Sequence, residues 1–159
     1  MIVYHGSDVI IEKPDINHSF RPLDFGKGFY VTANLEQATR WAKRKSDINN
    51  KSQCYVNVYD LSEFGTAYKV KRFSDDLREW IDFVCDCRDG KNDYSNYDVI
   101  EGKVADDKVF RVVDLYHSGV WDKDRALKEI KVYPGYDQIA FISQHAIDNL
   151  LTFVRADEV

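Results

Sequence analysis

Two glycines, Gly26 and Gly28, flank Lys27 directly before the aromatic pair Phe29 and Tyr30. Glycine adopts backbone dihedrals that other residues rarely reach, and it lets a backbone approach a ligand closely. The segment is therefore predicted to be a sharp turn that runs into a strand. Two interpretations stay open: a tight hairpin with an aromatic plug, or a stacking platform for a planar ring. The spacing is not that of the dinucleotide-binding loop G-x-G-x-x-G, which lies between a strand and a helix.

Strands and helices are both predicted along the rest of the chain. Strand-forming residues predict strands over residues 1–5, 55–61, 97–102, 137–142 and 151–154. Apolar residues at helical spacing predict helices from residues 34 and 74 and over 105–118, 122–131 and 143–150. Asn34, Ser74 and Ser143 are expected N-caps. Because long strand–helix–strand repeats are absent, the expected fold class is α+β, with a split or curved mixed β-sheet and flanking helices.

Length and composition narrow the class of protein. The 159 residues fit one domain over residues 1–159, and an apolar fraction of 44% is too high for general disorder. There are 22 Lys and Arg residues against 27 Asp and Glu residues, which gives a net charge of −5. This acidity disfavours a general, high-affinity nucleic-acid binder and leaves nucleic acid open as a transient substrate.

The cysteines and the N-terminal sequence favour a cytoplasmic protein. Cys54, Cys85 and Cys87 are odd in number and lack paired spacing, so we expect buried or half-buried free thiols. No cluster of His, Cys or carboxylate residues has the spacing of metal ligands, so no metal is expected. The N-terminus lacks the regions of a signal peptide. No apolar run reaches the roughly 18 residues of a membrane span, so no membrane partner is expected.

The first predicted strand ends in Tyr4-His5-Gly6-Ser7. A histidine at a strand end, followed by glycine and a small hydroxyl residue, can present its imidazole and free backbone N–H groups to one ligand. The alternative is a purely structural or solvated histidine, the role expected for the three other histidines of the chain.

These two motifs, followed by a helix that carries Ala38, Trp41 and Ala42, resemble the ADP-ribosyltransferase superfamily. More closely, they resemble an uncharacterised bacterial branch with a PDI…DFGxGFYxT block. The matching positions are residues 14–16, Arg21, 24–32, 37–43, Trp80, 83–84, 98–100, Gly102, 105–106 and 137–141. The resemblance therefore spans nearly the whole chain.

The resemblance implies NAD as co-substrate and a catalytic set of His5, Tyr30 and Gln138 on three strands. His5 would hydrogen-bond the adenosine ribose, and the Gly6 backbone would hold the nicotinamide amide. Tyr30 would stack on the nicotinamide ring. Arg21 and Lys27 are candidates for the pyrophosphate, for which the planar fork of arginine is well suited, with solvated loop charges as the alternative for both. The residues expected at the cofactor are Gly6, Ser7, Arg21, Asp24, Phe25, Gly26, Gly28, Phe29 and Thr32, with core packing as an alternative role for Phe25.

Gln138 departs from the superfamily, where a glutamate usually binds the 2′-hydroxyl of the nicotinamide ribose. Breaking the nicotinamide–ribose bond develops positive charge on the sugar, which a neighbouring carboxylate stabilises. Glutamine keeps the hydrogen bond but supplies neither charge nor base. Losing one such stabiliser costs about 3–4 kcal/mol, or about two to three powers of ten in rate. Asp106, Asp107 or Asp137 could supply the carboxylate, or could be ordinary solvated or capping acids.

The expected function is an NAD-dependent mono-ADP-ribosyltransferase, either a bacterial toxin or a phage-defence effector. It would transfer ADP-ribose to a macromolecule, protein or nucleic acid, and release nicotinamide. A toxin would add a cognate antitoxin protein as a partner. Three alternatives stay open: an NAD glycohydrolase, a non-catalytic module that binds NAD or ADP-ribose, and an interaction protein that docks an inhibitor through its aromatic surface.

Overall fold

The computed structural model describes residues 1–18, 23–133 and 135–159, and within them it contains seven strands and five α-helices. The strands are β1 (Ile2–Ser7), β2 (Phe29–Val31), β3 (Tyr55–Leu61), β4 (Val70–Arg72), β5 (Val99–Lys103), β6 (Asp137–Phe141) and β7 (Leu151–Glu158). The α-helices are α1 (Leu35–Ile48), α2 (Arg78–Arg88), α3 (Asp107–His117), α4 (Lys123–Ile130) and α5 (Gln144–Leu150). Two 3-10 turns cover Ile16–His18 and Asp93–Asn96.

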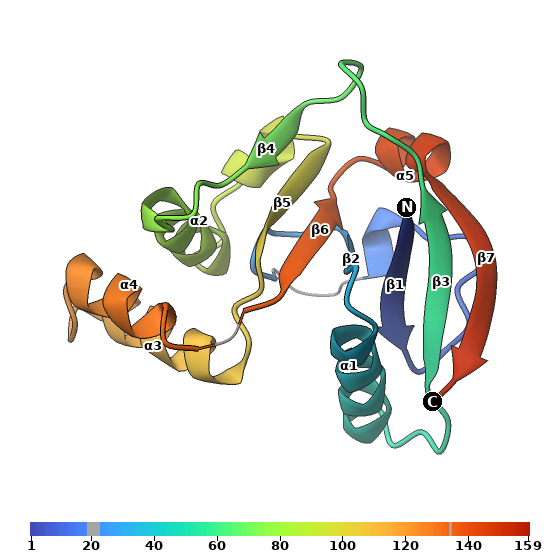
Figure 1. The fold of residues 1–159 in the computed structure, drawn as a ribbon, viewed down its shortest axis with the longest axis horizontal. Helices are drawn as coiled ribbons and strands as arrows, with labels where there is room; N and C mark the ends of the chain where they lie inside the picture. Colours follow the sequence, from blue (N-terminus) through green and yellow to red (C-terminus); the bar gives the residue numbers. More distant parts are fainter. Residues whose placement is uncertain (19–22, 134) are drawn as a thin grey trace.

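The strands form two sheets that meet where β1 lies beside β2 (Figure 1). One sheet has the order β1-β3-β7 and is antiparallel, and the other has the order β2-β6-β5-β4, with β4 and β5 parallel. Tyr4 of β1 and Thr32, just after β2, exchange two backbone hydrogen bonds of 2.8 and 2.9 Å between the sheets. The expected α+β class with a split sheet is confirmed.

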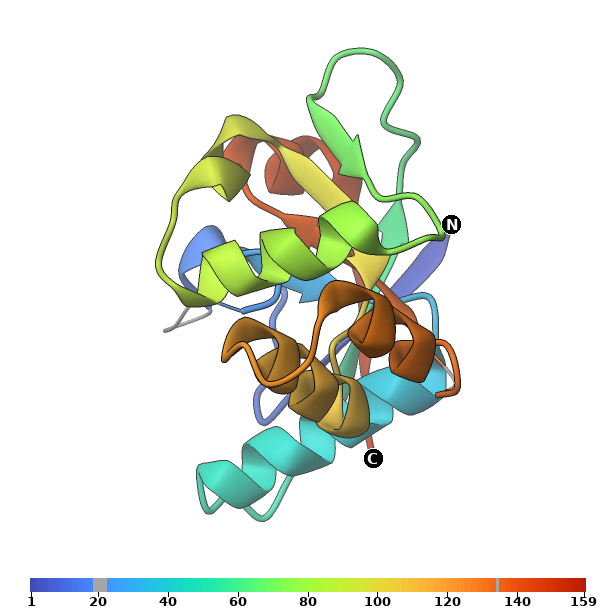
Figure 2. The same ribbon diagram turned by 90° about the vertical axis from the view of Figure 1, so that its left-hand side faces the viewer.

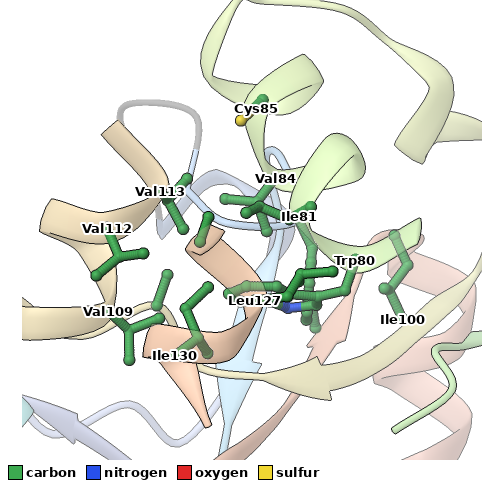
Figure 3. Close-up of a cluster of buried hydrophobic side chains, with 14 of the residues drawn as sticks. Trp80, Ile81, Val84, Cys85, Ile100, Val109, Val112, Val113, Leu127 and Ile130 are labelled. Carbon is green, nitrogen blue, oxygen red and sulfur yellow. The ribbon is translucent and has the colours of Figure 1, made fainter. Parts of the chain in front are cut away.

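Apolar side chains lie on both faces of the four-stranded sheet, because successive residues of a strand face opposite sides. Phe29 and Val31 of β2 join a cluster with residues of β1, β3 and α5. Tyr30, between them, faces the other way and joins a second cluster. Side chains of α2, α3 and α4 form most of that cluster (Figure 3). Figure 2 shows these three helices in front of the four-stranded sheet. The aromatic pair of the glycine-rich segment is therefore divided between two cores.

Local capping chemistry sets the start of α1 as expected. The side chain of Asn34 accepts a hydrogen bond of 2.8 Å from the backbone N–H of Gln37. The backbone N–H of Asn34 is held by the hydroxyl of Thr32 at 3.1 Å. The Gln37 side chain accepts from Arg40, so the cap forms without the reciprocal glutamine contact of a capping box. Ser143 likewise caps α5.

The expected start of the second helix at Ser74 is wrong. The hydroxyl of Ser74 donates to Asp76 at 3.0 Å, and Asp76 accepts from the backbone N–H of Arg78, where α2 begins. Leu77 precedes the helix in a left-handed conformation with φ of +61°. The short strand β4 was not expected, and β7 is longer than expected.

The three cysteines are free and buried. Burial raises the pKa of the Cys85 thiol to about 11 and that of Cys87 to about 12. Among the described residues, no helix combines the length and apolar composition needed to cross a bilayer.

Candidate functional site

Three strands that follow one another across the junction of the sheets carry His5, Tyr30 and Gln138. His5 lies on β1, Tyr30 on β2 and Gln138 on β6. The backbone pairing of β1 with Thr32 joins the first two strands, and β2 pairs directly with β6. The hydroxyl of Thr32 also donates to the carbonyl oxygen of Asp137, at 3.0 Å. The fold thus places the two N-terminal motifs, on β1 and β2, next to β6.

His5 has one ring nitrogen held by the backbone and one that faces no partner in the described ranges. Its Nδ1 lies 2.6 Å from the carbonyl oxygen of Tyr30, and its ring stacks on Phe29 with the centroids 4.3 Å apart. Because a carbonyl oxygen only accepts, Nδ1 carries the proton and Nε2 holds the lone pair. Nε2 is buried and has no hydrogen-bond partner among the residues that the structure describes. A ligand hydroxyl or N–H could therefore donate to it.

Burial keeps this imidazole neutral. The pKa of His5 is lowered to about 4: removal from water is the largest cause, the hydrogen bond to the Tyr30 carbonyl opposes it, and the charges of Lys45 and His18 add to the lowering. At neutral pH the group is therefore an acceptor at Nε2 and not a cation.

Gly6 is required by the close packing of β1 on α1. A Cβ at this position would lie 2.0 Å from the carbonyl oxygen of Ala38 and 2.5 Å from the amide nitrogen of Ala42. Since Tyr4 directs its backbone groups toward β2, the backbone groups of Gly6 point to the same edge of β1. Ser7 is buried, and its hydroxyl lies 3.4 Å from both a carboxylate oxygen of Asp8 and the backbone nitrogen of Val9.

Tyr30 lies inside the helix-covered core. Only 6% of the residue is exposed, and its hydroxyl donates to the carbonyl oxygen of Gly26 at 2.6 Å and accepts from the backbone N–H of Phe25 at 3.0 Å. Burial, with the nearby charge of Asp24, raises the pKa of this phenol well above its usual value. The hydroxyl thus holds the turn before β2. Stacking of nicotinamide on this ring stays a prediction, and it would require the covering side chains to move.

The two glycines of the turn are also fixed by packing. Gly26 has a φ of +84°, and a Cβ there would lie 2.3 Å from the ring of Tyr94. A Cβ at Gly28 would lie 2.5 Å from the carbonyl oxygen of Phe141. Phe25 and Phe29 are buried as well. Residues 24–30 therefore form a turn whose aromatic side chains are buried in the core.

Asp24 makes the polar contact to Gln138. One of its carboxylate oxygens, Oδ2, accepts from Nε2 of Gln138 at 2.9 Å and from the backbone N–H of Ala105 at 2.8 Å. The guanidinium of Arg88 lies 3.5 Å from the other oxygen. Burial raises the pKa of Asp24, while the Ala105 N–H, the charge of Arg88 and the Gln138 amide lower it. The largely buried carboxylate of Asp24 therefore lies directly beside Gln138, whose own side chain is an uncharged amide.

The three acids considered from the sequence lie elsewhere. Asp107 is exposed and pairs with Arg44 at 3.4 Å, and Asp106 is the N-cap of α3 without a side-chain cap bond. The side chain of Asp137 is exposed, and its contribution to the junction is the backbone contact with Thr32. Within the described part of the chain, none of the three makes a hydrogen bond to Gln138.

Lys27 and Arg21 were the expected pyrophosphate ligands. Arg21 lies outside the described residues. Lys27 is exposed and borders a surface cleft of about 330 Å³ at the start of β2. Lys69, Tyr94 and Tyr97 also line this cleft. No group of three or more potential metal ligands occurs in the described ranges.

Sequence reasoning missed Arg88 and the backbone of Ala105. Arg88 is the last residue of α2, and a basic residue at a helix C-terminus is favoured by the helix dipole. Nothing in the sequence therefore indicated that Arg88 would lie next to Asp24. Its guanidinium also lies 3.8 Å from the ring centroid of Phe110 and 3.3 Å from Asp114. Only the folded chain brings these groups together with Asp24.

Comparison with known proteins places the chain in one family. Residues 1–153 match the sequence model of the family described as "Protein of unknown function (DUF3990)". No curated protein and no solved structure matches the chain. The family match covers every described site residue from His5 to Gln138.

Proposed function

The chain belongs to the DUF3990 family, and we propose that it is an NAD-dependent ADP-ribosyltransferase that passes ADP-ribose to a macromolecule. The observation that carries the proposal is the placement of His5, Tyr30 and Gln138 on the neighbouring strands β1, β2 and β6. These residues come from separate parts of the sequence. Their motifs resemble those of the ADP-ribosyltransferase superfamily. Their arrangement on three strands is the one that the resemblance implies.

The proposed reaction breaks the bond between the nicotinamide nitrogen and C1′ of its ribose. The bonding electrons leave with nicotinamide, which departs as a neutral molecule, and positive charge develops on the sugar. A nucleophile of the acceptor then bonds to C1′ and releases its proton to solvent. Nε2 of His5 would accept a hydrogen bond from a ribose hydroxyl of NAD, and the amide oxygen of Gln138 would accept another.

A second candidate is a module that binds NAD or ADP-ribose without cleaving it. One observation favours it: Gln138 has no negative charge of its own. The missing charge weakens transition-state stabilisation more than it weakens ground-state binding.

The experiment that separates these functions uses NAD labelled on the adenylate phosphate, mixed with the protein and a whole-cell lysate. Label is then measured in protein, RNA, DNA and small-molecule fractions. His5→Gln removes the free imidazole acceptor. His117→Gln is the matched control, since His117 is an exposed histidine paired with Asp89. Circular dichroism verifies that both variants are folded.

Label in one macromolecular fraction, lost in His5→Gln and kept in His117→Gln, supports transfer and identifies the acceptor class. Label found only as free ADP-ribose assigns an NAD glycohydrolase instead. Intact NAD that binds in calorimetry assigns the binding module. Intact NAD with no binding refutes an NAD-dependent function.

A further inference from the structure

The orientation of the Gln138 amide is set by its neighbour. Gln138 is 4% exposed, and its Nε2 donates to Oδ2 of Asp24 at 2.9 Å. An ionised carboxylate only accepts hydrogen bonds, so with Asp24 ionised beside Arg88 the NH₂ group of the amide faces Asp24. The reverse orientation would place two oxygens against each other. The amide oxygen Oε1 is therefore the atom that Gln138 turns away from Asp24.

Asp24 is itself held by three parts of the chain. It lies in the turn before β2, where the backbone N–H of Gly26 closes on the carbonyl of Leu23 at 3.0 Å. The backbone N–H of Ala105, just before α3, donates to the same oxygen as Gln138. Arg88, at the end of α2, lies near the other oxygen, and each of the two side chains is 15% exposed. The position of the carboxylate is thus fixed before any ligand binds.

We infer that Asp24 is the positioning residue of the proposed site: it fixes the Gln138 amide so that Oε1 accepts a hydrogen bond from a ribose hydroxyl, and it places a negative charge one hydrogen bond behind that oxygen. The inference rests on the proposed function. Together the two side chains supply an acceptor and a charge, the two properties that positive charge developing on a ribose requires. The pair selects a ribosyl group that carries the hydroxyl over a deoxyribosyl group.

The test compares nicotinamide release under single-turnover conditions, with the protein in excess over NAD and well above the dissociation constant, which is measured separately. Asp24→Asn removes the charge and lets either end of its own amide face Gln138. The expected result is a fall in the release rate of at least about tenfold per folded molecule, with a smaller change in NAD binding. Asp114→Asn is the matched control, because it removes the other carboxylate near Arg88 without touching Gln138. It should leave the rate unchanged.

An exchanged pair tests the positioning role directly. In Asp24→Asn combined with Gln138→Glu, the amide of residue 24 can donate to the carboxylate of residue 138, so the hydrogen bond and the charge are both kept. Release should return to at least the wild-type rate. Urea unfolding of each variant shows whether a change in rate follows a change in stability. A wild-type rate in Asp24→Asn, or no recovery in the exchanged pair when it is folded, overturns the inference.

A readout without NAD separates this inference from the proposed function. In ¹⁵N-labelled protein, the side-chain NH₂ of Gln138 should be protected from exchange with solvent, and Asp24→Asn should reduce that protection. If wild-type protein neither binds NAD nor releases nicotinamide, the proposed function fails. Free exchange of the Gln138 amide in wild-type protein overturns the Asp24 contact, whatever the result with NAD.

Discussion

The Nδ1 atom of His5 lies 2.6 Å from the carbonyl oxygen of Tyr30, 25 residues further along the chain. This contact joins a side chain of one sheet to the backbone of the other, beside the pairing of Tyr4 with Thr32. It also fixes the tautomer of the imidazole, so that Nε2 is left as a buried acceptor. The hydrogen bond between His5 and Tyr30 therefore helps to join the two sheets. It also leaves Nε2 of His5 able to accept a hydrogen bond from a ligand.

The stability of the protein should fall in mild acid because of His5. Its pKa is lowered from 6.5 to about 4 in the folded state. As the pH falls below 6.5, the unfolded chain takes up a proton that the folded chain refuses, so folding loses stability until the pH passes about 4. The loss from this residue should be about 3 kcal/mol. Urea unfolding of wild-type protein and His5→Gln at about pH 7.5 and about pH 4 checks it. A variant with the same pH dependence as wild type would refute the assignment.

Replacing Gly6 by alanine should severely destabilise the fold. The new Cβ would meet backbone atoms of α1 at 2.0 and 2.5 Å, and these atoms cannot move without shifting the helix. Overpacking of this kind costs about 1–3 kcal/mol or more. Gly135→Ala is the control, because its nearest atom is the terminal nitrogen of Lys103, at the end of a flexible side chain. Thermal unfolding should show a large decrease for Gly6→Ala and little change for Gly135→Ala, and equal effects would contradict the packing argument.

Local chemistry explains why much of the fold could be predicted from the sequence. The caps Asn34 and Ser143 depend on one side chain and a backbone N–H three residues later, and both were expected. Strand β3 has the predicted bounds, since its residues favour strands by themselves. In contrast, β4 is a strand because it pairs with β5, and Ser74 fails as a cap because Asp76 binds its hydroxyl. Both results depend on contacts with other residues, which the strand and helix propensities of a segment do not reveal.

The site was predictable only where a motif is local. The positions of His5 and Tyr30 followed from short motifs, and the structure places them in contact through the Tyr30 backbone. The contact between Asp24 and Gln138 spans 114 residues, and no pattern in the sequence indicates it. The burial of Tyr30 depends on which face of the sheet the helices cover. That is a property of the assembled core and not of the motif.

Gln138→Glu should destabilise the fold as the pH rises. The new carboxylate would lie beside the largely buried Asp24, and two like charges at hydrogen-bond distance cannot both ionise readily. The pKa of the pair is then raised in the folded state, so stability is present at low pH and is lost as the pH rises through that value. The cost at neutral pH should be on the order of 3 kcal/mol. Urea unfolding at about pH 5 and about pH 8 tests the sign, and adding Asp24→Asn should remove the dependence.

Tyr30→Phe should weaken both the fold and the binding of NAD. The change removes a hydroxyl that donates to the Gly26 carbonyl and accepts from the Phe25 N–H, and it leaves that buried N–H without a partner. Such a loss costs about 1–3 kcal/mol. Tyr59→Phe is the matched control, because Tyr59 is fully buried and its hydroxyl donates to Ile11 at 2.6 Å, away from the turn.

Both tyrosine variants should therefore unfold at lower urea concentration than wild type. Only Tyr30→Phe should also raise the dissociation constant for NAD in calorimetry, because only its hydroxyl holds the turn that carries Asp24. Equal NAD binding by the two variants, measured where both are folded, would show that the turn does not contribute to the site. A weaker affinity in Tyr59→Phe alone would instead place the ligand near the segment that Ile11 anchors.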